Sequence, residues 1–326
     1  MNVTLADIAQ ATTTSISTVS RVLSGGPASG RISQQMRQRV VEAAARLGYR
    51  PNLVARSLRT QRTNTVALMV SDIANPWFGR LASQIEQHLH RGGYSLMLCN
   101  SCEDGKLERE YLQLLPLKGI DGLILVPLAA TRAALATAMG RMLPLVIVDR
   151  PIPGVPSVSS DSEQSAAILC DRLTAAGVRR IGLVSGPALI VTHRQRAEAI
   201  AKRFEALCVH EGPAQPETGR EAWEKARSLP IDAMVCTNNF LGQGVIEAMT
   251  DQRDFRPVAC FDEIPMMHLL PLPIVCNVQD VPKLAEESVR LMIAQLSGEQ
   301  LPAAHGVVPS TTVSNALFDR LAESKR

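Results

Sequence analysis

Hydrophobic positions near the start of the chain follow the spacing of a short amphipathic helix. Leu5, Ile8 and Ala9 recur at i, i+3 and i+4, the period of a helix that buries one face. Thr4 precedes them as the predicted N-cap, and Asp7 stands in the first turn, where a carboxylate complements the positive helix end. We therefore predict that a helix begins directly after Thr4.

A second helix is predicted to begin near Ser15 or Ser17 and to pack against the first. Its inward residues are Val19, Val22 and Leu23. Its outward residues are Ile16, Ser17, Thr18 and Arg21. Small hydroxyl side chains and an arginine on an exposed helix suit a DNA major groove, where such groups contact base edges. The same pattern is equally typical of two solvent-exposed amphipathic helices. A further observation must therefore decide whether this helix pair binds DNA.

From residue 63 onward, short apolar runs alternate with segments of helix length. The runs are 65–70, 95–100, 122–126 and 145–149, followed by 180–185, 233–237, 258–262 and 274–278. Near-continuous runs of Val, Ile and Leu are typical of parallel strands covered on both faces. The sequence therefore predicts an α/β protein: a helix-turn-helix head followed by two doubly wound parallel-sheet lobes.

The charge distribution favours DNA binding by the head. Residues 1–62 contain nine Arg, no Lys and two acids, a net charge of +7, whereas the whole chain of 326 residues carries +3. Residues 63–326 therefore carry −4. A basic head on an acidic remainder is typical of a nucleic-acid-binding domain joined to an unrelated body. Arg in place of Lys also suits forked contacts to phosphate and guanine.

Composition indicates a cytoplasmic protein of more than one domain. The chain begins without a secretory signal, and no stretch approaches 18 uncharged apolar residues, so we expect no membrane association. An odd number of cysteines, seven, indicates reduced thiols, and the single C-x-x-C pair of Cys99 and Cys102 is a weak signal. His88 and His90 would face different sides of a helix, so we expect no metal and no cofactor.

The sequence resembles the lactose-repressor (LacI) family of transcription regulators. The similar segments in the head are Val3–Ala9, Ser15–Leu23 and Gly48–Leu58. Further similar segments are Asp72–Phe78, Cys99–Ser101, Asp121–Ile124, Asp149–Arg150 and Phe261–Glu263. Because ordered matches extend over nearly the entire chain, they are far more specific than any single motif. The segments around 180–262 are more similar to the fructose-repressor branch than to the lactose or purine branches.

The resemblance implies a domain organisation. It implies a DNA-binding domain at 1–48, a hinge helix at 49–62 and a periplasmic-binding-protein-like core at 63–326 that binds an effector and dimerises. The N-lobe would comprise about 63–161 and 279–306, and the C-lobe about 162–276 and 308–320. The chain would cross between the lobes near 160–163, 275–279 and 306–309.

The resemblance also implies how the protein contacts DNA. The head residues would be Thr4, Ile16, Ser17, Thr18 and Arg21, and the hinge residues Asn52, Ala55 and Leu58. The hinge is too short to be a stable helix alone, so it would fold on DNA and insert Leu58 into the minor groove.

One departure affects the turn between the two helices. The family usually has Ala-Gly-Val where Thr12, Thr13 and Thr14 stand here. Without the glycine, either Thr13 accepts a strained backbone or the turn is reshaped.

Polar side chains follow the predicted strands, at the edge where ligands bind open α/β sheets. They include Ser71-Asp72, Asn75, Asn100-Ser101, Asp149-Arg150, Asn238-Asn239, Asp262-Glu263 and Gln279-Asp280. Trp77 and Phe78 follow Asn75 and Pro76, and a Trp-Phe pair in a strand-end loop suits stacking on a sugar face, although packing in the core is the alternative for each ring.

By position in the family, Arg196 corresponds to an effector-binding arginine, with Thr192 beside it. Arg196, Arg150 and a helix N-terminus favour an anionic group, and Asn239 replaces a carboxylate that the family often has there. We expect a small carbohydrate effector, with a sugar phosphate or sugar acid favoured. The expected effector residues are Asn75, Trp77, Phe78, Asp149, Arg150, Thr192, Arg196, Asn238, Asp262 and Gln279.

These observations predict a repressor of a carbohydrate-utilisation operon, not an enzyme. The chain lacks G-x-x-x-x-G-K-[ST], G-x-S-x-G and H-E-x-x-H motifs. A solute-binding protein for sugar transport is the alternative, opposed by the basic head and the missing export signal. A palindromic operator requires a two-fold protein, and the tail after Ser314 is too short for a tetramerising bundle, so we expect a homodimer.

Overall fold

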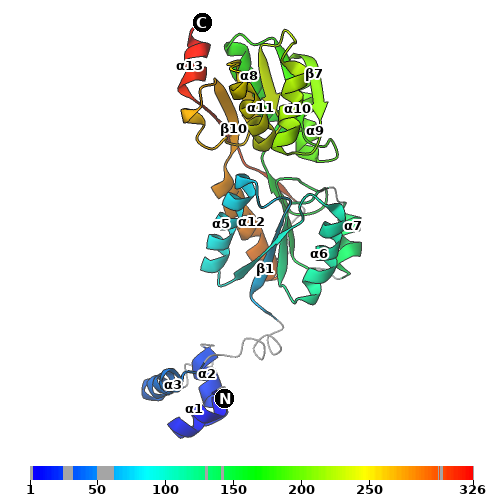
Figure 1. The fold of residues 1–326 in the computed structure, drawn as a ribbon. Coiled ribbons are helices and arrows are strands. Elements are labelled where there is room, and N and C mark those ends of the chain that lie inside the picture. Colours follow the sequence, from blue (N-terminus) through cyan, green and yellow to red (C-terminus); the bar gives the residue numbers. More distant parts are fainter. Residues whose placement is uncertain are drawn as a thin grey trace. The chain divides into compact units, whose positions relative to one another are not determined.

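The computed structural model describes residues 3–24, 32–49, 62–128, 131–140, 143–299, 301 and 304–325. By its internal contacts the chain divides into two units, Met1–Thr63 and Asn64–Arg326. Each unit has its own hydrophobic core. Figure 1 labels the helices of the first unit and the main helices and strands of the second. The prediction of a helical head followed by a two-lobed α/β core is confirmed.

The head consists of three helices around a small core. They are α1 (Leu5–Thr12), α2 (Ile16–Ser24) and α3 (Gln34–Leu47). Ile8 and Val19 are fully buried against Val40 of α3, as the hydrophobic spacing of the first two helices requires. Gly48 ends α3 with a φ of 67°, a left-handed conformation that glycine adopts without strain.

The second unit contains two six-stranded sheets, one in each lobe. The first lobe contains β1 (Thr65–Val70), β2 (Ser95–Asn100), β3 (Gly122–Leu125), β4 (Leu145–Val148), β5 (Ser157–Ser159) and β11 (His305–Val307). All its pairings are parallel, in the order β11-β5-β4-β3-β1-β2. Its helices are α5 (Pro76–Arg91), α6 (Gly105–Leu117), α7 (Arg132–Met139) and α12 (Val281–Leu296).

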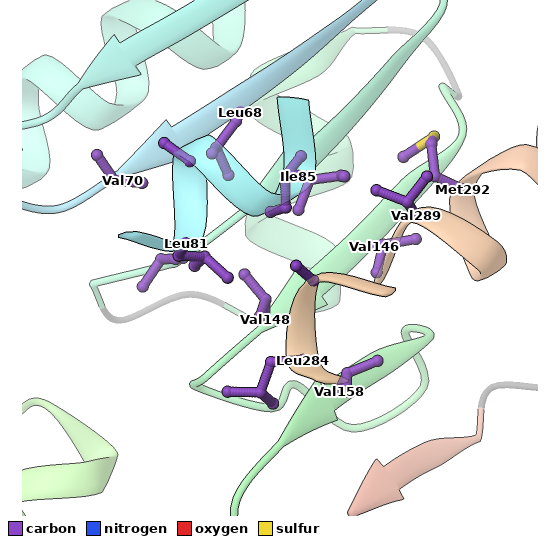
Figure 2. Packing of buried hydrophobic residues seen from close by; sticks show 14 of the residues in the cluster. Leu68, Val70, Leu81, Ile85, Val146, Val148, Val158, Leu284, Val289 and Met292 are labelled. Atoms are coloured by element: carbon purple, nitrogen blue, oxygen red, sulfur yellow. The ribbon is translucent and has the colours of Figure 1, made fainter. Parts of the chain in front are cut away.

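Helices cover both faces of the first sheet. One face packs against α5 and α12, where Leu81, Ile85 and Leu284 meet strand residues such as Leu68 and Val148 (Figure 2). The other face packs against α6 and α7. Because both faces are buried, every residue of β3 is buried, which explains the unbroken apolar runs in the sequence.

The second lobe is similar, with one strand reversed. Its strands are β6 (Arg180–Ser185), β7 (Glu205–Glu211), β8 (Ala233–Cys236), β9 (Val258–Phe261), β10 (Ile274–Gln279) and β12 (Ser310–Ser314). The order is β12-β10-β9-β8-β6-β7, and the edge strand β12 pairs antiparallel to β10. Its helices are α8 (Ser162–Ala175), α9 (Val191–Ala201), α10 (Pro216–Ala226), α11 (Asn239–Asp251), the short 3-10 helix η2 (Met267–Leu269) and α13 (Ala316–Glu323).

In the described part of the chain, three connections join the two sheets. β5 leads through residues 160–161 to α8, β10 leads through Asp280 to α12, and β11 leads through residues 308–309 to β12. These connections place the carboxyl ends of the parallel strands of both sheets at the boundary between the lobes. That boundary holds the candidate ligand pocket.

Candidate DNA interface and ligand pocket

The start of α1 is fixed by a reciprocal cap. The Thr4 hydroxyl accepts a hydrogen bond from the Asp7 backbone N–H at 3.4 Å, and the Asp7 carboxylate accepts one from the Thr4 N–H at 2.7 Å. The backbone bond from Thr4 is the main reason that the pKa of the Asp7 carboxyl lies below its usual value. The predicted N-cap is confirmed, and Thr4 stands at the positive end of α1, which suits contact with a phosphate.

The outward residues of α2 share one accessible side. Ile16 is 53% exposed, Ser17 and Arg21 are exposed, and Thr18 is half-buried, whereas Val19 and Val22 are buried. The Ser15 hydroxyl bonds those of Ser17 and Thr18 at 2.8 and 2.9 Å, which orders the first turn of the helix. The expected orientation of α2 is thus present. The hinge residues Asn52, Ala55 and Leu58 lie outside the described residues.

The turn before α2 keeps its helix-turn-helix geometry without glycine. Thr13 has φ 50° and ψ 49°, the left-handed region, and its N–H bonds the carbonyls of Ala9 and Gln10. Of the two outcomes expected for this turn, the strained backbone at Thr13 is the one observed.

A pocket between the two lobes contains all ten of the residues expected to bind the effector. Its space measures about 460 Å³ with the open mouth included. The lining residues are Asp72, Asn75, Trp77, Phe78, Glu103, Asp149, Arg150, Thr192, His193, Arg196, Ala214, Asn238, Phe240, Asp262 and Gln279. Carboxyl ends of parallel strands share one edge of a sheet, so residues far apart in the sequence meet here.

On the first-lobe side, Arg150 is held in a buried position behind Asp149. Its Nη1 donates to the Pro127 carbonyl at 3.0 Å, and its Nε lies 3.5 Å from Asp149 Oδ2. Burial lowers the pKa of the Arg150 guanidinium, opposed by the charges of Asp149 and Glu103. Asp149 itself has a φ of 69°, a strained backbone conformation at the end of β4 that turns its side chain into the pocket.

On the second-lobe side, Arg196 extends from α9 across the end of the sheet. Its Nη1 donates to the Thr237 carbonyl at 3.0 Å, and its guanidinium lies 4.4 Å from the centre of the Phe261 ring. Asp262 Oδ2 is 3.9 Å from Arg196 Nη1, a loose ion pair. Thr192, one turn earlier on α9, is buried and lines the same wall. Contacts within the second lobe therefore fix the orientation of the guanidinium.

Gln279 joins the two sides of the pocket. Its Nε2 lies 3.3 Å from Asp149 Oδ1 and 3.3 Å from Asp262 Oδ1. Burial raises the pKa of the Asp262 carboxyl, an effect that Arg196 opposes and Asp149 reinforces. Two carboxylates from different lobes are thus held near each other by one amide.

Trp77 and Phe78 do not lie in a loop as expected. They occupy the first turn of α5, capped by Asn75, and both are buried in the core cluster that includes Leu81. Their rings meet edge to face with centroids 4.9 Å apart, and both line the pocket. The core alternative is therefore confirmed for both rings, and their stacking on a sugar stays a prediction.

Several polar atoms of the pocket residues are buried without a hydrogen-bond partner among the described residues. They are Trp77 Nε1, Arg150 Nε, Arg196 Nε and Gln279 Oε1. Buried polar groups are normally paired, so these four atoms are exceptional among the residues of the pocket wall.

Sequence reasoning missed five pocket residues as ligand contacts: Asp72, Glu103, His193, Ala214 and Phe240. Asp72 lies at a strand end that the sequence predicts. Glu103 lies three residues beyond β2, and the chain turns it into the pocket through two residues with left-handed backbone, Cys102 and Glu103 itself. Burial raises the pKa of the Glu103 carboxyl, with Asp72 adding to the effect. Four carboxylates therefore line the pocket, those of Asp72, Glu103, Asp149 and Asp262.

His193 and Thr237 form a buried contact in the pocket wall. His193 Nδ1 lies 2.7 Å from the Thr237 hydroxyl. Burial and the neighbouring Arg196 and Arg150 hold the pKa of His193 well below its usual value, so its ring is neutral at pH 7. A neutral ring bonds a hydroxyl without adding charge to the pocket.

None of the helices in the described part of the chain combines the length and apolar composition that a membrane crossing requires.

Together, the helix-turn-helix head and the two-lobed core with its cleft define the class: a DNA-binding protein with a small-molecule-binding body.

Comparison with known proteins identifies the family. Residues 4–52 match the lacI family of bacterial regulatory proteins, and residues 63–256 match the periplasmic binding proteins and sugar binding domain of the LacI family. The ribose operon repressor of Bacillus subtilis is 31% identical over 322 residues, which span 95% of this chain and 97% of that protein. The PurR repressor of Haemophilus influenzae is 26% identical over 310 residues, spanning 90% and 91%.

Solved structures share the fold. The lac repressor dimer bound to operator and the anti-inducer ONPF matches with a TM-score of 0.84 at 22% identity, over 96% of this chain and 98% of that one. The Cra regulator of Pseudomonas putida in complex with fructose 1-phosphate matches with a TM-score of 0.72 at 22% identity, over 77% and 98%. The chain belongs to the LacI family of bacterial transcriptional regulators, and the resemblance stated from the sequence is confirmed.

Proposed function

We propose that this protein is a repressor that binds a palindromic operator as a homodimer and responds to a sugar in the pocket between its lobes. One observation carries the proposal: all ten residues expected to bind an effector line a single pocket, in a chain that also carries a DNA-binding head. The relatives named as ribose operon repressors support a sugar-utilisation operon as the target. The lac repressor dimer on its operator supports two-fold binding.

For DNA recognition, we propose that α2 lies in the major groove with Ile16, Ser17, Thr18 and Arg21 toward the bases. Thr4 would contact the backbone, and Asn52, Ala55 and Leu58 the minor groove. Arg21→Ala should then cost roughly 1–3 kcal/mol on the operator and relax preference at one base pair per half-site. Arg46→Ala, in the last turn of α3, is the control. Equal losses for Arg21→Ala on operator and random DNA would make Arg21 a phosphate contact.

For the effector, we propose an uncharged, hydroxyl-rich sugar. Four carboxylates face two guanidiniums in the pocket, and both guanidiniums already lie near carboxylates, Arg150 near Asp149 and Arg196 near Asp262. A phosphate would add negative charge beside Asp72 and Glu103, whereas hydroxyl groups can donate to these carboxylates. The guanidiniums of Arg150 and Arg196 line the same pocket and can donate to sugar oxygens. The sugar phosphate or sugar acid favoured by the sequence is the competing hypothesis.

Calorimetric titration of the full-length protein with ribose and ribose 5-phosphate separates these hypotheses. Ribose should bind more tightly, and Arg196→Met should weaken it roughly ten- to a hundredfold by removing a charge-assisted hydrogen bond. Affinity for DNA without ligand should stay near wild type. Tighter binding of the phosphate ester would refute the neutral-ligand proposal. A chain that binds sugar but no DNA would favour the solute-binding alternative.

We further propose that the protein assembles as a dimer. The helix α13 spans eight residues and buries Phe318 and Ala322 in the second lobe, so α13 itself supplies no apolar seam for a four-stranded bundle. Light scattering at micromolar concentration should give the mass of two chains.

A further inference from the structure

The two lobes are joined by a reciprocal pair of side-chain amides at the pocket edge. Asn75 Nδ2 donates to Asn239 Oδ1 at 2.9 Å, and Asn239 Nδ2 donates to Asn75 Oδ1 at 3.1 Å. Both residues are buried, with 6% and 2% of their surface exposed. Asn75 caps α5 of the first lobe, and Asn239 begins α11 of the second. The pair therefore crosses from lobe to lobe.

Backbone groups fix the orientation of both amides. The Trp77 N–H donates to Asn75 Oδ1 at 3.0 Å, and the Phe240 N–H donates to Asn239 Oδ1 at 3.0 Å. Each oxygen is therefore directed by its own helix, and each NH₂ group must face the other lobe. Each amide oxygen thus accepts two hydrogen bonds, and each NH₂ group donates one to the other lobe.

Further polar contacts cross between the lobes on the same side. Arg80, just over one turn after Asn75 on α5, places Nη1 2.7 Å from Oε2 of Glu263. Gln215 Nε2 lies 3.5 Å from Asp72 Oδ2. The side chains of Arg80 and Glu263 are 44% and 46% exposed, so solvent screens that ion pair. The amide pair is buried, as is the contact of Gln279 with Asp149, so its loss should matter more than the loss of the exposed ion pair.

The helices that carry the pair also carry pocket residues. Trp77 and Phe78 follow Asn75 directly, and Asn238 and Phe240 flank Asn239. Asn239 itself does not line the pocket. A substitution at Asn239 therefore affects ligand binding through the relative position of the two lobes. It tests lobe closure without removing a residue that lines the pocket.

We propose that Asn75 and Asn239 are positioning residues that hold the two lobes closed before an effector binds. The pair raises the population of the binding-competent arrangement, and the apparent dissociation constant of the effector varies inversely with that population. This consequence for affinity rests on the proposed function of the pocket, whereas closure of the ligand-free protein does not.

The chemistry of the pair suggests isosteric variants. Asn239→Asp keeps the oxygen that accepts from Phe240 but replaces the NH₂ donor with an oxygen that faces Asn75 Oδ1. Asn75→Asp keeps the cap of α5 and loses the other donor. Gln87→Glu is the matched control, because it makes the same change of charge at an exposed position of α5.

The test measures the distance between the lobes in the full-length protein. Spin labels are introduced through non-natural amino acids at the exposed positions Ser83 on α5 and Gln243 on α11, which leaves the native cysteines intact. Pulsed electron paramagnetic resonance then gives the distance distribution without ligand. We expect a single short distance for wild type and Gln87→Glu, and longer distances for Asn75→Asp and Asn239→Asp. Ribose titration should show a roughly tenfold weaker affinity for both Asp variants.

Unchanged distance distributions in both Asp variants would overturn the proposal, as would a broad, open distribution in wild type. Unchanged ribose affinity in variants whose lobes have opened would overturn the link to binding. Failure of ribose to bind wild type would instead count against the proposed effector, because the ligand-free distances decide closure independently.

Discussion

Replacement of Thr13 by glycine should stabilise the DNA-binding head. Thr13 is exposed and has φ 50° and ψ 49°. The left-handed conformation costs an L-residue roughly 1–2 kcal/mol, whereas glycine adopts it freely. Glycine also adds about 0.5–1 kcal/mol of chain entropy to the unfolded state. The expected net gain in the free energy of unfolding is about 0.5–1 kcal/mol.

Hydrogen exchange of the full-length protein measures this gain in the head. Amides of α1 and α3 that exchange through unfolding of the head should exchange roughly two- to fivefold more slowly in Thr13→Gly, since 1.4 kcal/mol corresponds to tenfold. Thr14→Gly is the matched control: its φ is outside the left-handed region, so glycine there should only destabilise. Faster exchange in Thr13→Gly, or equal effects of both changes, would refute the strain argument.

Two further predictions concern the core. Gly244→Ala should lower the free energy of unfolding in urea by about 1–3 kcal/mol, because a Cβ there would overlap the Pro216 carbonyl between α10 and α11. Gly79→Ala, with open space around it in α5, should instead raise it by about 0.5–1 kcal/mol, and similar effects at both glycines would contradict the packing argument. Asp262→Asn should change how stability depends on pH: since burial raises the pKa of Asp262 above 3.8, its contribution is present below pH 3.8 and is lost as pH rises through the folded pKa. As pH rises through the folded pKa, the free energy of unfolding of wild type should therefore fall relative to that of Asp262→Asn. A difference in free energy that does not change with pH would show that the Asp262 carboxyl is not buried.

Local sequence signals were sufficient for strands that carry an apolar run, including the partly exposed edge strand β2. β1, β2 and β6 have the bounds of their apolar runs, and the Thr4 cap and the α2 face follow from spacing alone. The signal failed at strands without such a run, which are the inner strand β5 and the edge strands β7, β11 and β12. β7 was missed because its residues are only partly buried and carry Glu205, His210 and Glu211, and β12 because its Ser and Thr residues resemble a loop. An edge strand is stabilised by one neighbour, so its composition is weakly constrained.

The sequence by itself determined which strand ends would meet, because parallel strands deliver their carboxyl ends to one edge whatever the loops between them. That rule, with the family resemblance, was enough to name ten residues that line one pocket. Only the tertiary structure decided what these residues do there. It turned Glu103 inward through two left-handed residues, and it paired each arginine with a carboxylate. It also joined Asn75 to Asn239 across 164 positions of sequence, a contact that no local pattern encodes because each asparagine is locally an ordinary helix-start residue. Which residue each asparagine contacts is decided by how the two lobes close.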